Sequence, residues 1–483
     1  MVKPKKIFFC GIFILMSLFT LAQDPEIPNV SINVQVPFIK DSTGKYCIKQ
    51  ILIKGNKKTK TYLILNEIPF KKEDSLQVSD FTRELLLARQ QVYNTTLFVE
   101  VKVALIAISP GDVAITIEVK ERWYIFPVPQ FQLVDRNLNE WIKTYKGSLD
   151  RVNYGIKFVH YNLSGRKDPL RIYLINGYTR NVSFSYTNPN SNHALNEGFT
   201  VFAGYAQNRE LPYITTIDNI VLEYKNGKFV RNSIYGGVGY SIRRGLFTRQ
   251  SFNLGYTHYS VNDSIVTEKY NPHYFNSPGV VKGFFDLVYR FQYTNVNNVA
   301  YALKGKTASL IISKRGLGLT GGINMLSIEA GYNKYYSLGK KWYSSIQLNG
   351  KIKLPFEQAY INQRGLGYGD SYLRGLEKYV IDGVATVLLK STLKKKIVHF
   401  SLPFPFHSKT ISRIPFTFFA KTYTDLGYSY TKNAYASRLN NRLLYTGGFG
   451  LDMLTLYDVN LRFEYSFNQL HENGLFLHNQ SGF

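Results

Sequence analysis

One arginine lies next to a glycine-rich stretch, and its setting indicates an electrostatic contact. The stretch Gly365–Gly383 reads Gly-Leu-Gly-Tyr-Gly-Asp-Ser-Tyr-Leu-Arg-Gly-Leu-Glu-Lys-Tyr-Val-Ile-Asp-Gly. Three glycines among its first five residues make the backbone too permissive for an ordinary strand. Arg374 follows as a single strong cation, directly before Gly375. Alternating apolar and polar segments flank the stretch, so we predict that residues 354–382 form a loop that folds back inside a barrel.

A carboxylate that could pair with this arginine occurs further along the chain. Tyr423, Asp425 and Gly427 are spaced by two, so on a strand they share one face with Lys421. A guanidinium and a carboxylate can form a bidentate pair, and Gly427 would leave room for the loop backbone. We therefore predict that Arg374 pairs with Asp425 on the inner wall. The alternative is that Asp425 is simply a polar residue near a strand end.

No motif in the chain indicates catalysis. There is no Gly-x-Ser-x-Gly or His-Glu-x-x-His motif, no metal-spaced cysteine pair, and no cluster among the eight histidines. Residues Gly316–Gly321 have a dinucleotide-type glycine pattern, but a strand follows rather than a helix, which indicates a hairpin turn. We expect no enzymatic activity, no metal and no cofactor. A site assembled from distant barrel residues stays open.

The composition is typical of a membrane barrel. Among 483 residues there are 37 Tyr and 33 Phe, and aromatic girdles at both bilayer interfaces require many such side chains. In 459–467 the odd positions are apolar and the even positions are polar, and similar alternation recurs at 285–294 and 346–353. Soluble sandwiches also alternate, but they seldom oppose such aromatic faces to charged faces in strand after strand. The pattern therefore predicts strands with lipid on one face and a lumen on the other.

Residues 123–483 are predicted to form a transmembrane antiparallel barrel of sixteen strands. The predicted loop then lies between the eleventh and twelfth strands. The strands are expected near 123–133, 152–161, 170–179, 181–189, 197–207, 230–242, 247–260, 281–295, 304–314, 322–336, 341–353, 383–394, 414–424, 443–453, 458–468 and 473–483.

The first residues indicate export. Residues 1–22 have three lysines, an apolar run and small residues before a plausible cleavage site, which predicts a signal peptide; the alternative is a membrane anchor. A linker is expected at 23–45. Since no later run reaches the ~18 apolar residues of a spanning helix, the protein would enter a membrane only as a barrel. Cys47 would be the one cysteine left after cleavage, and we predict that it is a small core residue in a strand.

The segment that follows predicts a small α+β domain at 46–122 with the order β-α-α-β-β. Strands are expected at 46–53, 99–105 and 113–119, and helices at 59–67 and 79–94. Thr59 is predicted to cap the first helix. Such a domain has exposed strand edges, to which an extended peptide can add through main-chain hydrogen bonds.

Several of these features resemble the BamA/TamA-like outer-membrane assembly-factor superfamily. The order within 46–122, with its Gly-Asn-Lys-Lys-Thr and Asn-Thr-Thr-Leu-Phe passages, is similar to a single POTRA domain; an unrelated α+β domain is the alternative. Leu-Arg-Gly-Leu around Arg374 resembles the Val/Ile-Arg-Gly-Phe/Tyr tip of the sixth extracellular loop, with leucine at both flanks. Tyr423-x-Asp425-x-Gly427 resembles Phe-x-Asp-x-Gly on strand thirteen. Phe483 resembles a C-terminal assembly signal.

The resemblance implies an outer-membrane insertion or translocation factor that templates client strands without nucleotide. It implies a Gram-negative outer membrane, a periplasmic POTRA domain, a weakly closed seam between the first and last strands, and a client-docking strand containing Val99, Glu100, Val101 and Lys102. Unfolded outer-membrane proteins, membrane lipid and periplasmic or lipoprotein accessory factors are the implied partners. Strand twelve departs from the family, because Lys390 lies where relatives often carry an inward glutamate. The rival functions are a passive porin-like channel and a structural surface barrel.

The chain is strongly basic, with a formal net charge of +26. The cations are scattered through strands and turns, without a tract or a nucleic-acid motif. We therefore assign the charge to a lumen and rim that face anionic lipid headgroups, and expect no nucleic-acid partner.

Overall fold

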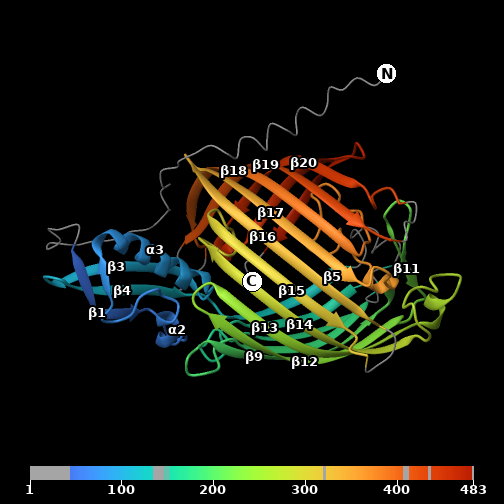
Figure 1. Cartoon of the computed structure of the whole chain (residues 1–483), viewed down its shortest axis with the longest axis horizontal. Helices are drawn as coiled ribbons and strands as arrows, with labels where there is room; N and C mark the ends of the chain where they lie inside the picture. The colour runs from blue at the N-terminus through green and yellow to red at the C-terminus, as the bar shows by residue number, and fades with distance from the viewer. Residues whose placement is uncertain are drawn as a thin grey trace, which may run out of the picture.

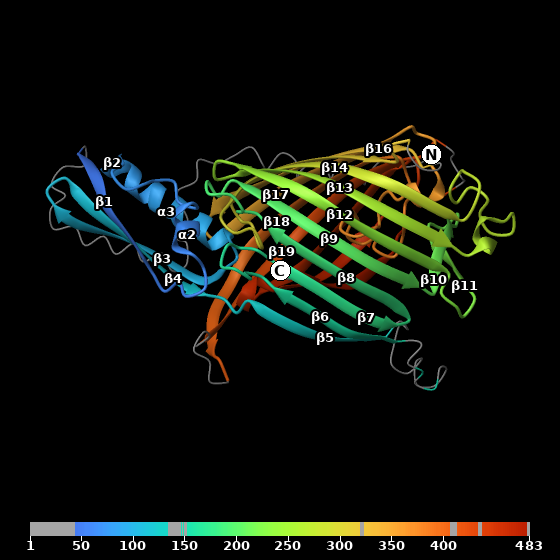
Figure 2. The same cartoon turned by 90° about the horizontal axis from the view of Figure 1, so that it is seen from below.

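A small α+β domain lies against one end of a large β-barrel (Figures 1 and 2). The computed structural model describes residues 44–133, 146, 148, 152–318, 323–405, 413–432 and 437–480. The predicted signal peptide, nearly all of the predicted linker and Phe483 lie outside these residues. No helix in the described ranges is long and apolar enough to cross a membrane.

The small domain has two helices packed on a four-stranded sheet, which confirms the predicted α+β fold. The sheet order is β2-β1-β4-β3, so β3 is an edge strand, and β1 and β4 run parallel. The three-residue strand β2 was not predicted, because it is too short to show alternation. The elements are β1 (Lys45–Lys54), α2 (Thr61–Leu65), β2 (Ser75–Gln77), α3 (Val78–Asn94), β3 (Phe98–Ser109) and β4 (Asp112–Glu121).

The core of this domain explains the position of Cys47. Tyr46 and Ile48 on β1 are buried in the core, together with Phe81 and Leu85 of α3. Because side chains of a strand alternate between its two faces, Cys47 points to the other face and is partly exposed. The prediction that Cys47 is a core residue was therefore wrong.

The barrel is one sixteen-stranded sheet in which consecutive members pair antiparallel, as predicted. A separate hairpin, β10 (Glu210–Thr215) with β11 (Val221–Lys225), lies in the connection between β9 and β12. Short 3₁₀ helices occur at Asp263–Val266, Tyr360–Asn362 and Leu456–Asp458. The barrel strands are β5 (Ile125–Leu133), β6 (Val152–His160), β7 (Leu170–Gly177), β8 (Thr179–Asn188), β9 (Glu197–Asn208), β12 (Arg231–Arg244), β13 (Thr248–Val261), β14 (Val281–Val296), β15 (Gly305–Arg315), β16 (Met325–Gly339), β17 (Trp342–Leu354), β18 (Ala385–Pro403), β19 (Arg413–Tyr430), β20 (Leu443–Leu454), β21 (Asn460–Asn468) and β22 (Asn473–Gln480).

Side chains alternate between the two faces of these strands as the sequence predicts. On β21, Phe463 and Phe467 are 43% and 47% exposed on the outer face, whereas Glu464 and Ser466 are buried on the inner face. The outer face therefore suits lipid, and the inner face collects polar and charged groups.

β5 and β22 are the two end strands of the sheet. Neighbouring strands from β5 round to β22 are hydrogen-bonded, but no ladder joins β5 to β22 within the described ranges. Phe131 on β5 and Leu475 and Leu477 on β22 are 65–72% exposed. We call these two end strands, β5 and β22, the seam.

The connection between β17 and β18, residues 355–384, folds back against the inner wall, and we call it the latch. An isolated bridge between Leu366 and Ile381 closes its stem. Leu373 and Leu376 of the latch pack in a buried cluster that includes Leu388 on the inner face of β18. The latch therefore has its own apolar anchor beside Arg374.

Candidate functional site

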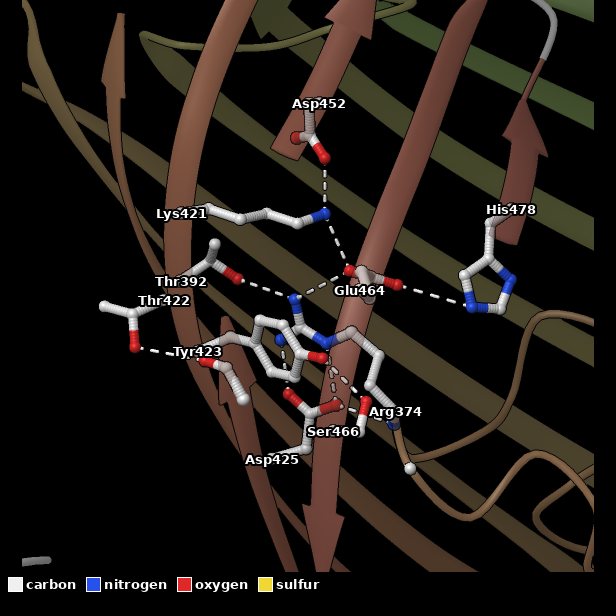
Figure 3. Close-up of polar contacts among 12 residues, drawn as sticks. Arg374, Thr392, Lys421, Thr422, Tyr423, Asp425, Asp452, Glu464, Ser466 and His478 are labelled. Atoms are coloured by element: carbon white, nitrogen blue, oxygen red, sulfur yellow. Dashed lines mark hydrogen bonds and ion pairs between the residues drawn. The ribbon is translucent and has the colours of Figure 1, made fainter. Parts of the chain in front are cut away.

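The structure brings Arg374 of the latch onto Asp425 of β19 (Figure 3). The guanidinium Nε donates to Asp425 Oδ2 at 2.9 Å, and Nη2 donates to Oδ1. The backbone amide of Arg374 also donates to Oδ2, at 3.0 Å. Asp425 is fully buried and Arg374 is 8% exposed. The pair has the bidentate geometry that the residue types allow.

Other groups of the inner wall fix the plane of the guanidinium. Its carbon lies 3.9 Å from the centroid of the Tyr423 ring, within the range of a cation–π contact. Nη1 donates to Thr392 Oγ1 at 3.1 Å. The Tyr423 hydroxyl is in turn 2.7 Å from Ser466 Oγ, which holds the ring in place. Residues of β18, β19 and β21 thus position one latch side chain.

Two glycines allow the close approach of latch and wall. Gly375 has φ +96°, and a Cβ there would lie 2.8 Å from the Cβ of Ser466. A Cβ on Gly427 would lie 2.9 Å from Leu373 Cδ1. Both predicted glycines therefore lie where the latch meets the strands, and Gly375 also needs a backbone conformation that other residues adopt at a cost.

We predict that Gly375→Ala destabilises the folded barrel by about 1–3 kcal/mol, because it combines a strained φ with the contact at Ser466. Gly369→Ala is the matched control: Gly369 has φ +58° in the same latch, but a Cβ there meets nothing within 4 Å. Unfolding by guanidinium chloride of the protein folded in lipid vesicles measures the free energy of unfolding of both variants. Equal losses in the two variants would show that the approach to Ser466 does not limit the latch.

A network of buried charges that sequence reasoning missed extends from this pair. Lys421 Nζ is 2.7 Å from Glu464 Oε1 and also contacts Asp452. Lys394 Nζ lies 3.2 Å from Asp452 Oδ2, and Arg374 Nη1 lies 3.8 Å from Glu464 Oε1. Cations and anions therefore alternate along the inner wall. Alternation could have placed each residue inward, but not beside the others.

The second acidic contact of Arg374 comes from β21 rather than from β18, which is the twelfth strand of the barrel. Lys390 on β18 pairs in register with Asp425, and its Nζ is 4.2 Å from the Tyr372 ring centroid. The position where relatives often carry a glutamate thus holds a cation that lies over a latch aromatic ring. Glu464 supplies the acidic group instead.

The latch also reaches the last strand of the barrel. His478 Nε2 on β22 lies 3.3 Å from Glu464 Oε2 and 3.4 Å from Glu377 Oε1 of the latch. Its ring stacks on Tyr372 with centroids 5.5 Å apart. The Asn468 amide of β21 donates to the carbonyl of Gly375 at 2.8 Å. Latch and seam are therefore in direct contact.

The predicted client-docking residues lie on the edge strand β3. Glu100 and Lys102 are exposed and form an ion pair of 3.0 Å, whereas Val101 is buried in the domain core. Arg89 Nε of α3 donates to the carbonyl of Val101 at 3.0 Å. In an antiparallel strand both main-chain groups of a residue point to the same side, so the amide of Val101 also faces the free edge. Arg89 therefore covers the free edge of β3 at Val101.

Buried ion pairs join the small domain to the barrel. Arg243 at the end of β12 donates from Nη1 and Nη2 to the two carboxylate oxygens of Glu67, at 2.8 and 2.7 Å, and both side chains are 4% exposed. Arg122 Nη2 lies 2.6 Å from Asp458 Oδ2 of the connection between β20 and β21. Burial alone would raise the pKa of Glu67, but Arg243 and neighbouring cations hold it below its ordinary value.

Thr59 belongs to the same interface rather than to a helix cap. Its Oγ1 is 3.0 Å from the Tyr124 hydroxyl and accepts from Asn162 Nδ2 at 3.0 Å. Lys60 is the N-cap of α2, without a side-chain cap bond, and the helix ends at Leu65. The predicted cap was therefore wrong, because this hydroxyl has a tertiary partner.

No group of three or more His, Cys, Asp or Glu side chains that could hold a metal ion occurs in the described part of the chain.

Comparison with known proteins identifies the small domain and finds solved structures with a similar fold. Residues 46–122 match the family described as POTRA, surface antigen variable number repeat. No curated protein matches the chain. Among solved structures, BamA from Haemophilus ducreyi lacking POTRA domains 1–3 has 16% identity and a TM-score of 0.50, over 90% of this chain and 84% of that chain. CdiB from Escherichia coli has 13% identity and a TM-score of 0.50, over 90% of this chain and 75% of that chain.

The fold and the matched domain define a POTRA–barrel protein. The POTRA domain that the resemblance implied is therefore present, and the fold of the whole chain is similar to that of BamA.

Proposed function

We propose that the protein inserts or translocates other proteins at the outer membrane of a Gram-negative bacterium, as a factor of the BamA/TamA type. The POTRA domain would lie in the periplasm and receive unfolded outer-membrane clients. The protein would template client strands through backbone hydrogen bonds, without nucleotide, cofactor or covalent chemistry.

The observation that carries this proposal is the seam. A closed barrel removes every strand edge, whereas here β5 and β22 share no ladder among the described residues. An unpaired edge can accept an additional strand through main-chain hydrogen bonds. Exposed Phe131, Leu475 and Leu477 border the seam, so a paired client strand would already have its apolar face toward lipid.

The latch argues against the passive channel as the main function. Leu373 and Leu376 are anchored in a buried cluster with Leu388, and Arg374 is held by several inner-wall groups. A segment packed in this way fills part of the lumen. The matched POTRA domain also has no evident use in a simple pore.

Reconstitution tests the proposal directly. Lipid vesicles that contain the protein should speed the folding of a urea-unfolded eight-stranded outer-membrane barrel at least tenfold over empty vesicles and over vesicles with a closed porin. Folding is followed by the gel shift between unboiled and boiled client. Solute flux through the vesicles with no acceleration of client folding would support the passive channel instead.

The edge of β3 gives a second, local prediction. A photo-crosslinking amino acid at Lys102 should capture an unfolded client, because this exposed side chain borders the free edge. The control is the same amino acid at Arg83, whose side chain is 70% exposed on α3. We expect at least tenfold more client adduct at Lys102 in mass spectrometry of the crosslinked protein. Equal yields at the two positions would contradict docking on β3.

A further inference from the structure

A pocket of about 210 Å³ lies at the junction of the POTRA domain and the barrel. The POTRA domain contributes Glu67 and Gln91, and the barrel contributes Lys167 and Arg249. Lys167 lies in the turn between β6 and β7, and Arg249 near the start of β13. The pocket is separate from the latch and from the edge of β3, so the proposed function does not use it.

The charges around this pocket do not balance. Among the described residues Glu67 is the one carboxylate that lines it, and both of its oxygens accept from Arg243. The third guanidinium nitrogen of Arg243, Nε, donates to the carbonyl of Gly245 at 2.9 Å, so Arg243 has its partners. Lys167 and Arg249 are the cations that remain. Arg249 comes no closer to Glu67 than 4.0 Å.

A buried donor without a partner lines the same pocket. Gln91 on α3 is 6% exposed, and its Nε2 makes no hydrogen bond. Buried amide groups nearly always have a partner, because an unmade hydrogen bond costs about 1–3 kcal/mol. The Nζ of Lys167 likewise forms no hydrogen bond or ion pair with the described residues. The Gln91 amide, the Lys167 ammonium and the Arg249 guanidinium therefore line one pocket whose carboxylate, Glu67, already accepts two bonds from Arg243.

The state of Lys167 agrees with this imbalance. Loss of hydration, reinforced by Arg249, lowers the pKa of Lys167 to about 7, and Glu67 offsets this only in part. An anion in the pocket would stabilise the protonated lysine, since an opposite charge nearby favours the charged form.

We propose that this pocket binds a phosphate group, which bridges the POTRA domain to the barrel. A phosphate offers several acceptor oxygens, which suits a guanidinium, an ammonium and an amide donor together. Its donors come from both domains: Gln91 from the POTRA domain, Lys167 and Arg249 from the barrel. Binding would therefore tighten the docking of the two domains. The phosphate can come from a phospholipid headgroup or from a free phosphate ion.

The test measures binding to the full-length protein folded in detergent. Isothermal titration calorimetry is carried out at constant ionic strength with two ligands. One is inorganic phosphate, and the other is dihexanoyl phosphatidylglycerol below its critical micelle concentration. Lys167→Met and Arg249→Gln should each weaken binding at least tenfold. Gln91→Leu, which removes a donor without changing charge, should weaken it about threefold to tenfold. Lys228→Met, which removes an exposed cation in the connection before β12, is the matched control and should leave binding unchanged.

Each outcome decides the proposal. Tighter binding of the short-chain lipid, lost in Lys167→Met, assigns the pocket to a headgroup; equal binding of both probes assigns it to free phosphate. No binding by the unsubstituted protein, or equal losses in Lys228→Met and Lys167→Met, would overturn the site. The gel shift on boiling shows whether each variant has folded. If Lys167→Met does not fold, Gln91→Leu and Arg249→Gln carry the test, and unchanged binding in both would overturn it.

Discussion

Arg374→Ala and Asp425→Ala should each lower the free energy of unfolding of the barrel by about 3–5 kcal/mol, and the double variant should lose little more than either one. Each single change leaves a buried charge without its partner. Asp425 is fully buried and accepts both the guanidinium and the backbone amide of Arg374, so little water can replace the lost contact.

The loss should be somewhat smaller for the aspartate variant, because the buried Arg374 guanidinium then still has Glu464 3.8 Å away. In the arginine variant Glu464 keeps Lys421 at 2.7 Å, so the loss arises from Asp425, whose guanidinium partner is gone. Arg374→Lys should recover only part of the stability, because an ammonium cannot form the two parallel bonds to Asp425 or lie flat on Tyr423. Client folding in vesicles should fall in the same order as the stability of the variants.

Unfolding by guanidinium chloride in lipid vesicles, measured for the single and double variants, gives the coupling energy between Arg374 and Asp425. An exposed ion pair of the same molecule provides the control. Lys432 Nζ and Glu357 Oε2 are 3.5 Å apart, with side chains 57% and 66% exposed. Their coupling should not exceed about 1 kcal/mol. Additive losses for Arg374 and Asp425 would mean that the two side chains do not stabilise each other, and the latch would then depend on its apolar cluster.

Arg243→Gln should weaken the docking of the POTRA domain on the barrel by about 3–5 kcal/mol, because it leaves the buried Glu67 carboxylate without its bidentate partner. Arg244→Gln removes the same charge one residue away, where the side chain is exposed, and serves as the matched control. Hydrogen exchange of the amides in α2 measures docking. The Arg243 variant should exchange much faster there, and the Arg244 variant should not. Equal exchange in both variants would show that this pair does not hold the domains together.

The same pair predicts a dependence on pH. The folded pKa of Glu67 lies below its ordinary value of 4.5, so its contribution to docking is complete above that value and is lost as the pH falls through the lowered pKa. The unsubstituted protein should therefore show faster exchange in α2 only in acid, below about pH 4.5. Glu67→Gln should be weakly docked at neutral pH and should lose this acid dependence. An acid transition of the same size in Glu67→Gln would assign it to another group.

Local alternation was enough to predict much of the barrel. A strand places residues two apart on one face, so the sequence alone separates Phe463 from Glu464 and puts Tyr423 and Asp425 on the same wall. The POTRA domain was also predictable, because apolar residues recur in its helices and longer strands at the spacing typical of each element. Strand β2, with three residues, is shorter than any period that could reveal it.

The contacts between distant segments depend on how the whole sheet curls. The sequence identifies Arg374 and Asp425 as chemically matched, but the buried charges Glu464 and Asp452 come beside Lys421 only through the pairing of β19, β20 and β21. No local pattern relates such residues, because the register of one strand on the next is set by the full ladder.

Positions at element ends were the least predictable from sequence. Thr59 has the chemistry of a helix cap, yet it bonds across the interface to Tyr124. Glu67 finds Arg243 although 176 positions separate them. Arg89 covers the carbonyl of Val101 on an edge that the sequence shows only as a strand. In each case the polar group has several possible partners of equal chemistry, and burial at one particular junction of the folded chain selects among them.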